Sequence, residues 1–83
     1  MDTGHLIHMA NRIGEFFASM PDRDEALAGI ADHIRRFWEP RMRRALLAAF
    51  DDPAGAAAQD AAPIVRDAIA AYRDTLAPAA APA

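Results

Sequence analysis

The chain has 83 residues, a formal net charge of −3 and no cysteine. A chain of this length makes one small domain and has no room for a second. Without cysteine, neither a disulfide framework nor a thiolate metal site can stabilise that domain. The negative net charge argues against a general nucleic-acid-binding protein.

Alanine is abundant, whereas β-branched residues and glycine are scarce. Because alanine favours helices and strands favour β-branched side chains, this composition predicts an all-α fold. We expect a small three- to four-helix bundle with a helix-Pro-helix corner, in a single domain over residues 1–76. No basic region followed by an apolar block begins the chain, and the longest strongly apolar run, residues 45–50, is too short to cross a bilayer. We therefore expect a cytoplasmic protein.

The first predicted helix covers residues 4–20. Its large apolar residues recur at steps of three and four, which predicts one buried face. This stripe consists of Leu6, Met9, Ile13, Phe16, Phe17 and Met20. Pro21 ends the helix, because a residue that precedes proline is disfavoured in the α region. Ile7 lies off the stripe, and we interpret it as a candidate contact with another protein.

A second helix is predicted over residues 23–38 and a third over residues 40–50. Asp22 suits the N-cap of the second helix, because its side chain can accept a bond from an unpaired backbone N–H group. Pro40 suits the first position of the third helix, where its missing N–H group costs nothing. The two helices therefore meet at a corner that contains a proline.

The apolar residues of these two helices again form stripes. The stripes consist of Leu27, Ile30, Ala31, Ile34, Phe37 and Trp38, and then of Met42, Ala45, Leu46, Ala49 and Phe50. The pattern predicts that the aromatic side chains of the corner, Phe37 and Trp38, face inward. Leu47 lies off the third stripe and is a second candidate for an outside contact.

The remaining residues are simpler in composition. Residues 51–62 are of low complexity and predict a flexible linker. Pro63 then opens a fourth helix, which we expect over residues 63–76. The alternation of proline with alanine over residues 77–83 predicts a disordered tail.

Nothing in the sequence predicts a catalytic centre. The chain contains one serine and two threonines, and it lacks both a glycine-rich phosphate loop and an HExxH motif. His5 and His8 could share a metal ion, but no third ligand follows at a suitable spacing, so two surface histidines are the favoured interpretation. We expect no catalytic, metal-binding or cofactor-binding residue in this chain.

The arginines are concentrated at the helix-Pro-helix corner. Residues 33–46 hold five arginines and one glutamate, a net charge of +4, whereas the other residues hold four arginines and eleven acidic residues, a net charge of −7. We call these five arginines the basic corner: Arg35, Arg36, Arg41, Arg43 and Arg44.

The basic corner has two interpretations. It can be an ordinary solvated face, or it can bind an acidic surface of a protein partner, because arginine and tryptophan are enriched at interface hot spots. For a partner, the candidate binding residues are the basic corner together with Trp38, Pro40, Ile7 and Leu47. A small nucleic-acid-binding helical module remains a less favoured alternative, because phosphates would be repelled by the acidic remainder of the chain.

Two segments resemble a known family. They read Met-Ala-Asn-Arg-Ile-Gly-Glu-Phe-Phe over residues 9–17 and Ala-Gly-Ile-Ala-Asp-His-Ile-Arg-Arg-Phe-Trp-Glu-Pro-Arg-Met-Arg over residues 28–43. Both are similar to the delta subunit of NAD-dependent formate dehydrogenases, which are cytoplasmic, molybdenum- or tungsten-containing, multi-subunit enzymes of bacteria. The resemblance extends over roughly residues 5 to 72.

The resemblance implies a non-catalytic accessory subunit that docks on the large catalytic subunit and stabilises it. It also implies that the molybdenum or tungsten cofactor, the iron–sulfur clusters and FMN lie in partner subunits. No cofactor-binding residue is carried over to this chain, which has no cysteine for an iron–sulfur cluster. A transient maturation chaperone that assists insertion of the molybdenum cofactor remains an alternative.

Overall fold

A computed structural model of the protein describes residues 2–52 and 54–78, without the side chains of residues 56 and 57. Every regular element within those residues is a helix, so the predicted all-α class is confirmed. The structure has α1 over Thr3–Phe17, α2 over Arg23–Phe37, α3 over Pro40–Asp51, α4 over Ala56–Asp60, α5 over Pro63–Ala71 and α6 over Arg73–Leu76.

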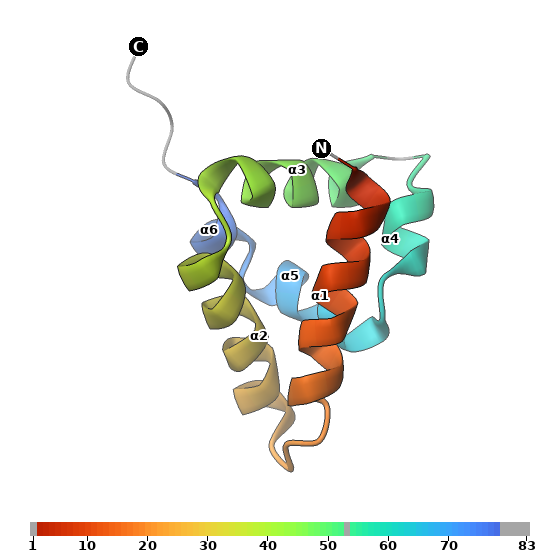
Figure 1. The fold of residues 1–83 in the computed structure, drawn as a ribbon. Coiled ribbons are helices and arrows are strands. Elements are labelled where there is room, and N and C mark those ends of the chain that lie inside the picture. The colour runs from red at the N-terminus through yellow and green to blue at the C-terminus, as the bar shows by residue number, and fades with distance from the viewer. Residues whose placement is uncertain (1, 53, 79–83) are drawn as a thin grey trace.

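The two longest helices, α1 and α2, run in opposite directions and are joined by a short turn (Figure 1). They spread apart away from that turn, and α3 crosses their other ends. The α5 helix packs behind both of them, α6 packs on α2, and α4 lies against α1 and α3. The chain thus folds as a helical bundle in which α3 lies across a pair of antiparallel helices.

Local sequence signals account for the helix boundaries. The side chain of Asp2 accepts a hydrogen bond from a backbone N–H group of the first turn of α1 at 3.0 Å, and Asp22 caps α2 in the same way with two such bonds. Pro40 and Pro63 occupy the first positions of α3 and α5, where a proline loses no intrahelical bond. The predicted corner between α2 and α3 therefore forms where the sequence places it.

Among the described side chains, the hydrophobic core is built from α1, α2, α3, α5 and α6. Trp38 is only 6 % exposed, in agreement with its predicted place on the buried face of α2. The largest fully buried side chains belong to α2, α3, α5 and α6, and they are Ile30, Ile34, Leu46, Val65 and Leu76.

The prediction for α1 placed the centre of its buried face wrongly. The helix buries Leu6, Ile7, Ala10 and Gly14, whereas Phe16, predicted to be inside, is 74 % exposed. Ile7 and Phe16 are nine positions apart, which is about 180° around a helix. The core therefore lies against the side with the small residues, because small side chains allow a neighbouring helix to come close.

Gly14 marks that close approach. A β-carbon at this position would lie 2.7 Å from Cγ2 of Val65 and 3.2 Å from Cγ2 of Ile64. Both distances are shorter than ordinary contact between carbon atoms. The α1 helix can pack directly on α5 only because residue 14 has no side chain.

Three further predictions at the helix faces need correction. Phe37 is 72 % exposed, because it lies at the end of α2, where α1 and α2 have already spread apart (Figure 1). Ile7 and Leu47, predicted to lie off the buried stripes, are both buried in the core cluster. Because α3 crosses α1, residues on the facing sides of these two helices become core residues.

The predicted flexible linker, residues 51–62, contains the short helix α4 and is bound to α1. The Asn11 side chain donates a hydrogen bond to the carbonyl of Asp60 at 3.0 Å and accepts one from the N–H group of Ala62 at 2.8 Å. Ala61, between them, is buried. Side-chain bonds to a connecting segment depend on tertiary position, so composition alone did not reveal them.

The last predicted helix, residues 63–76, is divided in two. Tyr72 leaves the helical region with φ −118° and ψ 24°, and α6 follows directly. Leu76 of α6 is nevertheless buried in the core. Most of the predicted disordered tail, residues 79–83, lies outside the described residues.

We expect Trp38→Ala to lower the free energy of unfolding by about 3–5 kcal/mol, because it removes a buried aromatic side chain and leaves a cavity. The neighbouring Phe37→Ala is the matched control, and it should change stability by no more than about 0.5 kcal/mol, because that ring is exposed. Denaturant unfolding followed by circular dichroism measures both. Equal losses from the two variants would contradict the different burial of these neighbours.

We expect Gly14→Ala to destabilise the protein by about 1–3 kcal/mol, although alanine is the better helix former. The new methyl group would collide with the buried, stiff side chain of Val65. Gly4→Ala provides the control. A β-carbon on Gly4 would have Oδ1 of Asp2, at 3.4 Å, as its nearest neighbour outside the helix backbone, which is an ordinary contact. Thermal unfolding of both variants tests this, and a Gly14→Ala protein as stable as the parent would show that α1 and α5 are not in close contact.

Candidate protein-interaction surface

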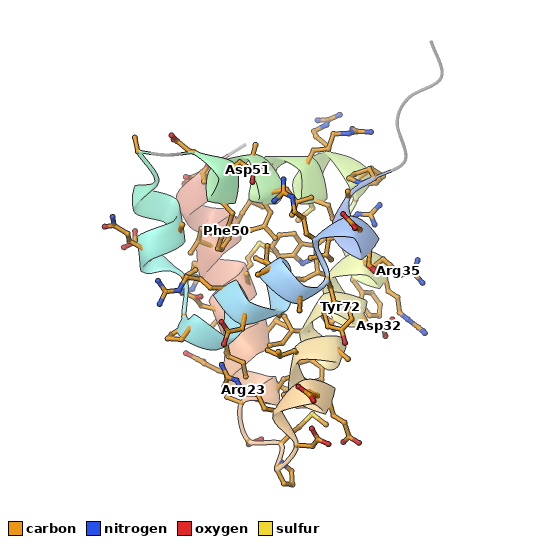
Figure 2. The ribbon with its side chains drawn as sticks, turned by 180° about the vertical axis from the view of Figure 1, so that it is seen from behind. Arg23, Asp32, Arg35, Phe50, Asp51 and Tyr72 are labelled. Carbon is orange, nitrogen blue, oxygen red and sulfur yellow. The ribbon has the colours of Figure 1, made fainter. Side chains whose placement is uncertain are left out.

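The basic corner lies where α2 ends and α3 begins. Arg35 and Arg36 occupy the last turn of α2, and the other three arginines follow Pro40 at the start of α3. Figure 2 shows Arg35 at the outer edge of α2. The corner thus collects at one end of the bundle the positive charge that the sequence concentrates in one segment.

Most arginines of the basic corner form no ion pair within the described residues, whereas two arginines elsewhere form ion pairs between helices. Within the described residues, only Arg36 of the basic corner forms one, with Asp32 of its own helix at 3.0 Å. Elsewhere, Arg23 is paired with Asp67, and Arg73 is paired with Asp51, so these arginines connect separate helices. Most guanidinium groups of the corner therefore remain available to carboxylates of a partner.

At the start of α3, arginine side chains outnumber acidic ones. The positive end of a helix dipole favours acidic side chains, yet the first turn of α3 contains no acidic residue and holds Arg41. Glu39, at the N-cap, forms no capping bond through its side chain. Anionic groups from outside would relieve this local repulsion, since they would neutralise both the arginines and the helix terminus.

Arg43 has a further unsatisfied group. Its Nε atom is buried and, within the described residues, finds no hydrogen-bond partner. A buried donor without a partner costs free energy, because it has lost its bonds to water. Such a local conflict is typical of a functional surface, where selection for binding outweighs selection for stability.

Of the other four candidate binding residues, one is exposed to solvent and three are buried. Pro40 is exposed beside the arginines, whereas Trp38, Ile7 and Leu47 are buried in the chain's own core. Trp38 therefore shapes the corner from inside and does not present its ring to a partner. Ile7 and Leu47 likewise offer no exposed side chain, so the structure gives no support to a direct contact through them.

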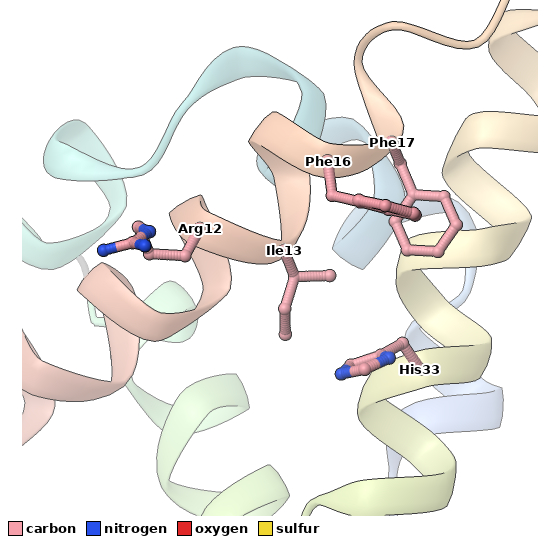
Figure 3. A pocket seen from close by; sticks show the side chains of 5 residues that line it. All are labelled: Arg12, Ile13, Phe16, Phe17 and His33. Atoms are coloured by element: carbon pink, nitrogen blue, oxygen red, sulfur yellow. The ribbon is translucent and has the colours of Figure 1, made fainter.

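The sequence patterns missed an exposed aromatic surface between α1 and α2. Arg12, Ile13, Phe16 and Phe17 of α1 and His33 of α2 line an open groove of about 470 Å³ (Figure 3). We call it the aromatic groove. Phe16 and Phe17 meet edge to face with their ring centroids 5.0 Å apart, an arrangement that aromatic rings favour. Only the rotation of α1 about its axis, which the sequence does not give, could have revealed this surface.

A glycine of α2 positions one wall of the groove. A β-carbon on Gly29 would collide with the ring of Phe17, so the ring lies directly on the backbone of α2. At the other end, the ring of His33 lies 4.8 Å from that of Phe37, measured between centroids. Aromatic side chains therefore extend from the end of α1 along one side of α2.

No group of three potential ligands among the described residues could hold a metal ion, and both His5 and His8 are exposed on α1. None of the described helices combines the length and the apolar character that crossing a bilayer requires.

Comparison with protein families places these features in context. The family model described as NADH-dependent formate dehydrogenase delta subunit, FdsD, matches residues 5–69. The match includes most of α1, all of α2 to α4 and most of α5, and hence both the aromatic groove and the basic corner. Comparisons with curated proteins and with solved structures found no match.

We expect Arg43→Met to raise the free energy of unfolding by roughly 1 kcal/mol, because it removes a buried donor without a partner and retains the length of the side chain. Arg44→Met is the control, since Arg44 is exposed and its replacement should leave stability nearly unchanged. Chemical denaturation at constant pH measures both variants. A less stable Arg43→Met protein would mean that the Arg43 guanidinium is satisfied in the folded chain.

Proposed function

The chain belongs to the family of NADH-dependent formate dehydrogenase delta subunits, and from this premise we propose that it is a non-catalytic accessory subunit of such an enzyme. It binds the large catalytic subunit in the cytoplasm and stabilises the assembled complex. The family match covers more than half of the chain, but it does not identify the surface that binds. That surface is proposed from the distribution of charge.

The observation that carries the proposal is the basic corner, four of whose five arginines form no ion pair within the described residues. Arginine forks bind carboxylates with two parallel hydrogen bonds, which gives both affinity and orientation. The start of α3 adds its unpaired backbone N–H groups and the positive end of the helix dipole. The matching surface on the large subunit is therefore acidic.

The rigidity of the corner supports the same role. The buried Trp38 ring and the proline at the start of α3 hold the two helices at a defined angle. Long side chains at a binding surface lose rotamer freedom, so a rigid backbone beneath them limits the entropy that binding costs. In this proposal Trp38 acts from within the domain, by positioning the arginines.

The redox chemistry is assigned to the partner subunits. Iron–sulfur clusters are held chiefly by cysteine thiolates, and this chain has no cysteine. We propose that the molybdenum or tungsten cofactor, the iron–sulfur clusters and FMN are all bound by other subunits. This chain would then affect turnover only through the stability or assembly of the enzyme.

Charge reversal tests the proposed surface. We expect the double variant Arg41→Glu, Arg44→Glu to weaken co-purification with the large subunit by about tenfold or more, because each substitution replaces an attraction with a repulsion. Arg66→Glu is the matched control, since Arg66 is an exposed arginine on α5 that also lacks an ion pair within the described residues. Pull-down at several salt concentrations measures the effect.

The pull-down and a second measurement, the subunit composition of the purified enzyme, separate the alternatives. Equal binding by the parent and the double variant would remove the basic corner from the interface. If the purified, cofactor-loaded enzyme lacks this chain, whereas the cofactor-free precursor contains it, the protein is a maturation chaperone and not a subunit. Stoichiometry in the active enzyme, measured by native mass spectrometry, decides between these two roles.

A further inference from the structure

Two phenylalanines are exposed, whereas the other large apolar side chains in the described part of the chain are buried or partly buried. Phe16 and Phe37 are 74 % and 72 % exposed, and no other large hydrophobic residue in the described part of the chain is exposed to this extent. Both belong to one aromatic surface, since Phe16 lines the aromatic groove and the ring of Phe37 lies against that of His33 at its edge, tilted by 43°. An apolar surface with this organisation is typical of a site that another molecule covers.

The shape of the aromatic groove indicates the kind of occupant. It is open along one side, between the last turns of α1 and the middle of α2 (Figure 3). Small-molecule sites enclose most of their ligand, so an open groove suits a side chain that projects from a protein segment. The walls formed by Ile13, Phe16 and Phe17 suit an aliphatic or aromatic side chain.

The polar groups at the groove specify the charge of that segment. Arg12 and His33 are the polar residues that line it, and no carboxylate lines it. The ion pair of Arg12 with Glu15 is long, at 3.9 Å, and both side chains are largely exposed. Such a pair contributes little, so Arg12 can turn to a carboxylate of the partner.

The groove is also continuous with the basic corner. His33 and Phe37 are one helical turn apart on α2, about 6 Å along its axis, and Arg36 lies in the same last turn. A segment that fills the groove and extends past Phe37 therefore reaches the end of α2, where the basic corner begins. One partner segment can occupy both surfaces.

We propose that the aromatic groove binds an acidic, amphipathic segment of the large catalytic subunit. An apolar side chain of that segment inserts between Phe16 and His33, and its carboxylates bind Arg12 on one side and the basic corner on the other. This inference rests on the proposed function, which it extends from one charged patch to a continuous surface with an apolar anchor. A second copy that packed groove against groove fits less well, because it would bring the two Arg12 side chains together and like charges repel.

Photo-crosslinking tests the occupant, because the chain has no cysteine and a single introduced thiol can be labelled selectively. Arg12→Cys carries a benzophenone maleimide at the edge of the groove and leaves the phenylalanines intact. Ala70→Cys is the control, since residue 70 is exposed on α5, which lies behind α1 and α2 (Figure 1). We expect the label at position 12 to attach to the large subunit in the assembled enzyme, and the label at position 70 not to attach.

A second measurement tests the apolar anchor. The double variant Phe16→Ala, Phe37→Ala should keep the parent's melting temperature, because both rings are exposed. It should lose at least about tenfold in affinity for the large subunit, since aromatic anchors contribute strongly to protein interfaces.

The outcomes separate this inference from the proposed function. If the complex forms but label at position 12 attaches only to another copy of this chain, or to nothing, the inference is wrong and the accessory role stands. Unchanged affinity of the double alanine variant has the same meaning. If the parent chain does not bind the large subunit at all, both the inference and the proposed function are overturned.

Discussion

The close approach of α1 to α5 at Gly14 is the constraint on which the exposed surface depends. With no side chain at this position, α1 packs through its small residues, and the methyl groups of Val65 occupy the space that a β-carbon would need. This contact sets the rotation of α1 about its axis. It turns Ile7 into the core and Phe16 outward, and so produces one wall of the aromatic groove. A packing requirement at one residue thus determines which aromatic side chains are available to a partner.

The corner between α2 and α3 joins stability to the proposed binding role. Trp38 is buried, whereas its neighbour Phe37 and most of the arginines around it face solvent. The segment therefore has a structural side, which fixes the angle between two helices, and a charged side, which the isolated chain leaves poorly neutralised. The arginines at the positive end of the α3 dipole and the buried Nε of Arg43 oppose stability. Both features are consistent with a chain that completes its interactions in a complex.

The connection between α3 and α5 shows how tertiary position can order a sequence of low complexity. Residues 51–62 are rich in alanine and of low complexity, and this composition favoured a flexible linker. Asn11 nevertheless bonds to both sides of Ala61 and holds the segment on α1. In the sequence, Asn11 belongs to the polar side of an amphipathic helix, where most side chains face water. Its partners are separated from it by 49 and 51 positions, beyond the reach of any periodic pattern.

The sequence by itself determined the all-α class, the corner at Pro40, the burial of Trp38 and the concentration of arginine at the corner. These properties follow from local chemistry: helix propensity, the missing N–H group of proline and the order of charges along the chain. Only the tertiary structure decided that Ile7 and Leu47 are buried, that Phe16 and Phe37 are exposed and that an aromatic groove exists. The spacing of apolar residues shows that a helix has a buried side, but it locates that side from the large apolar residues alone. Packing can instead favour small residues such as Gly14, where another helix comes close, and which helix comes close depends on the whole fold.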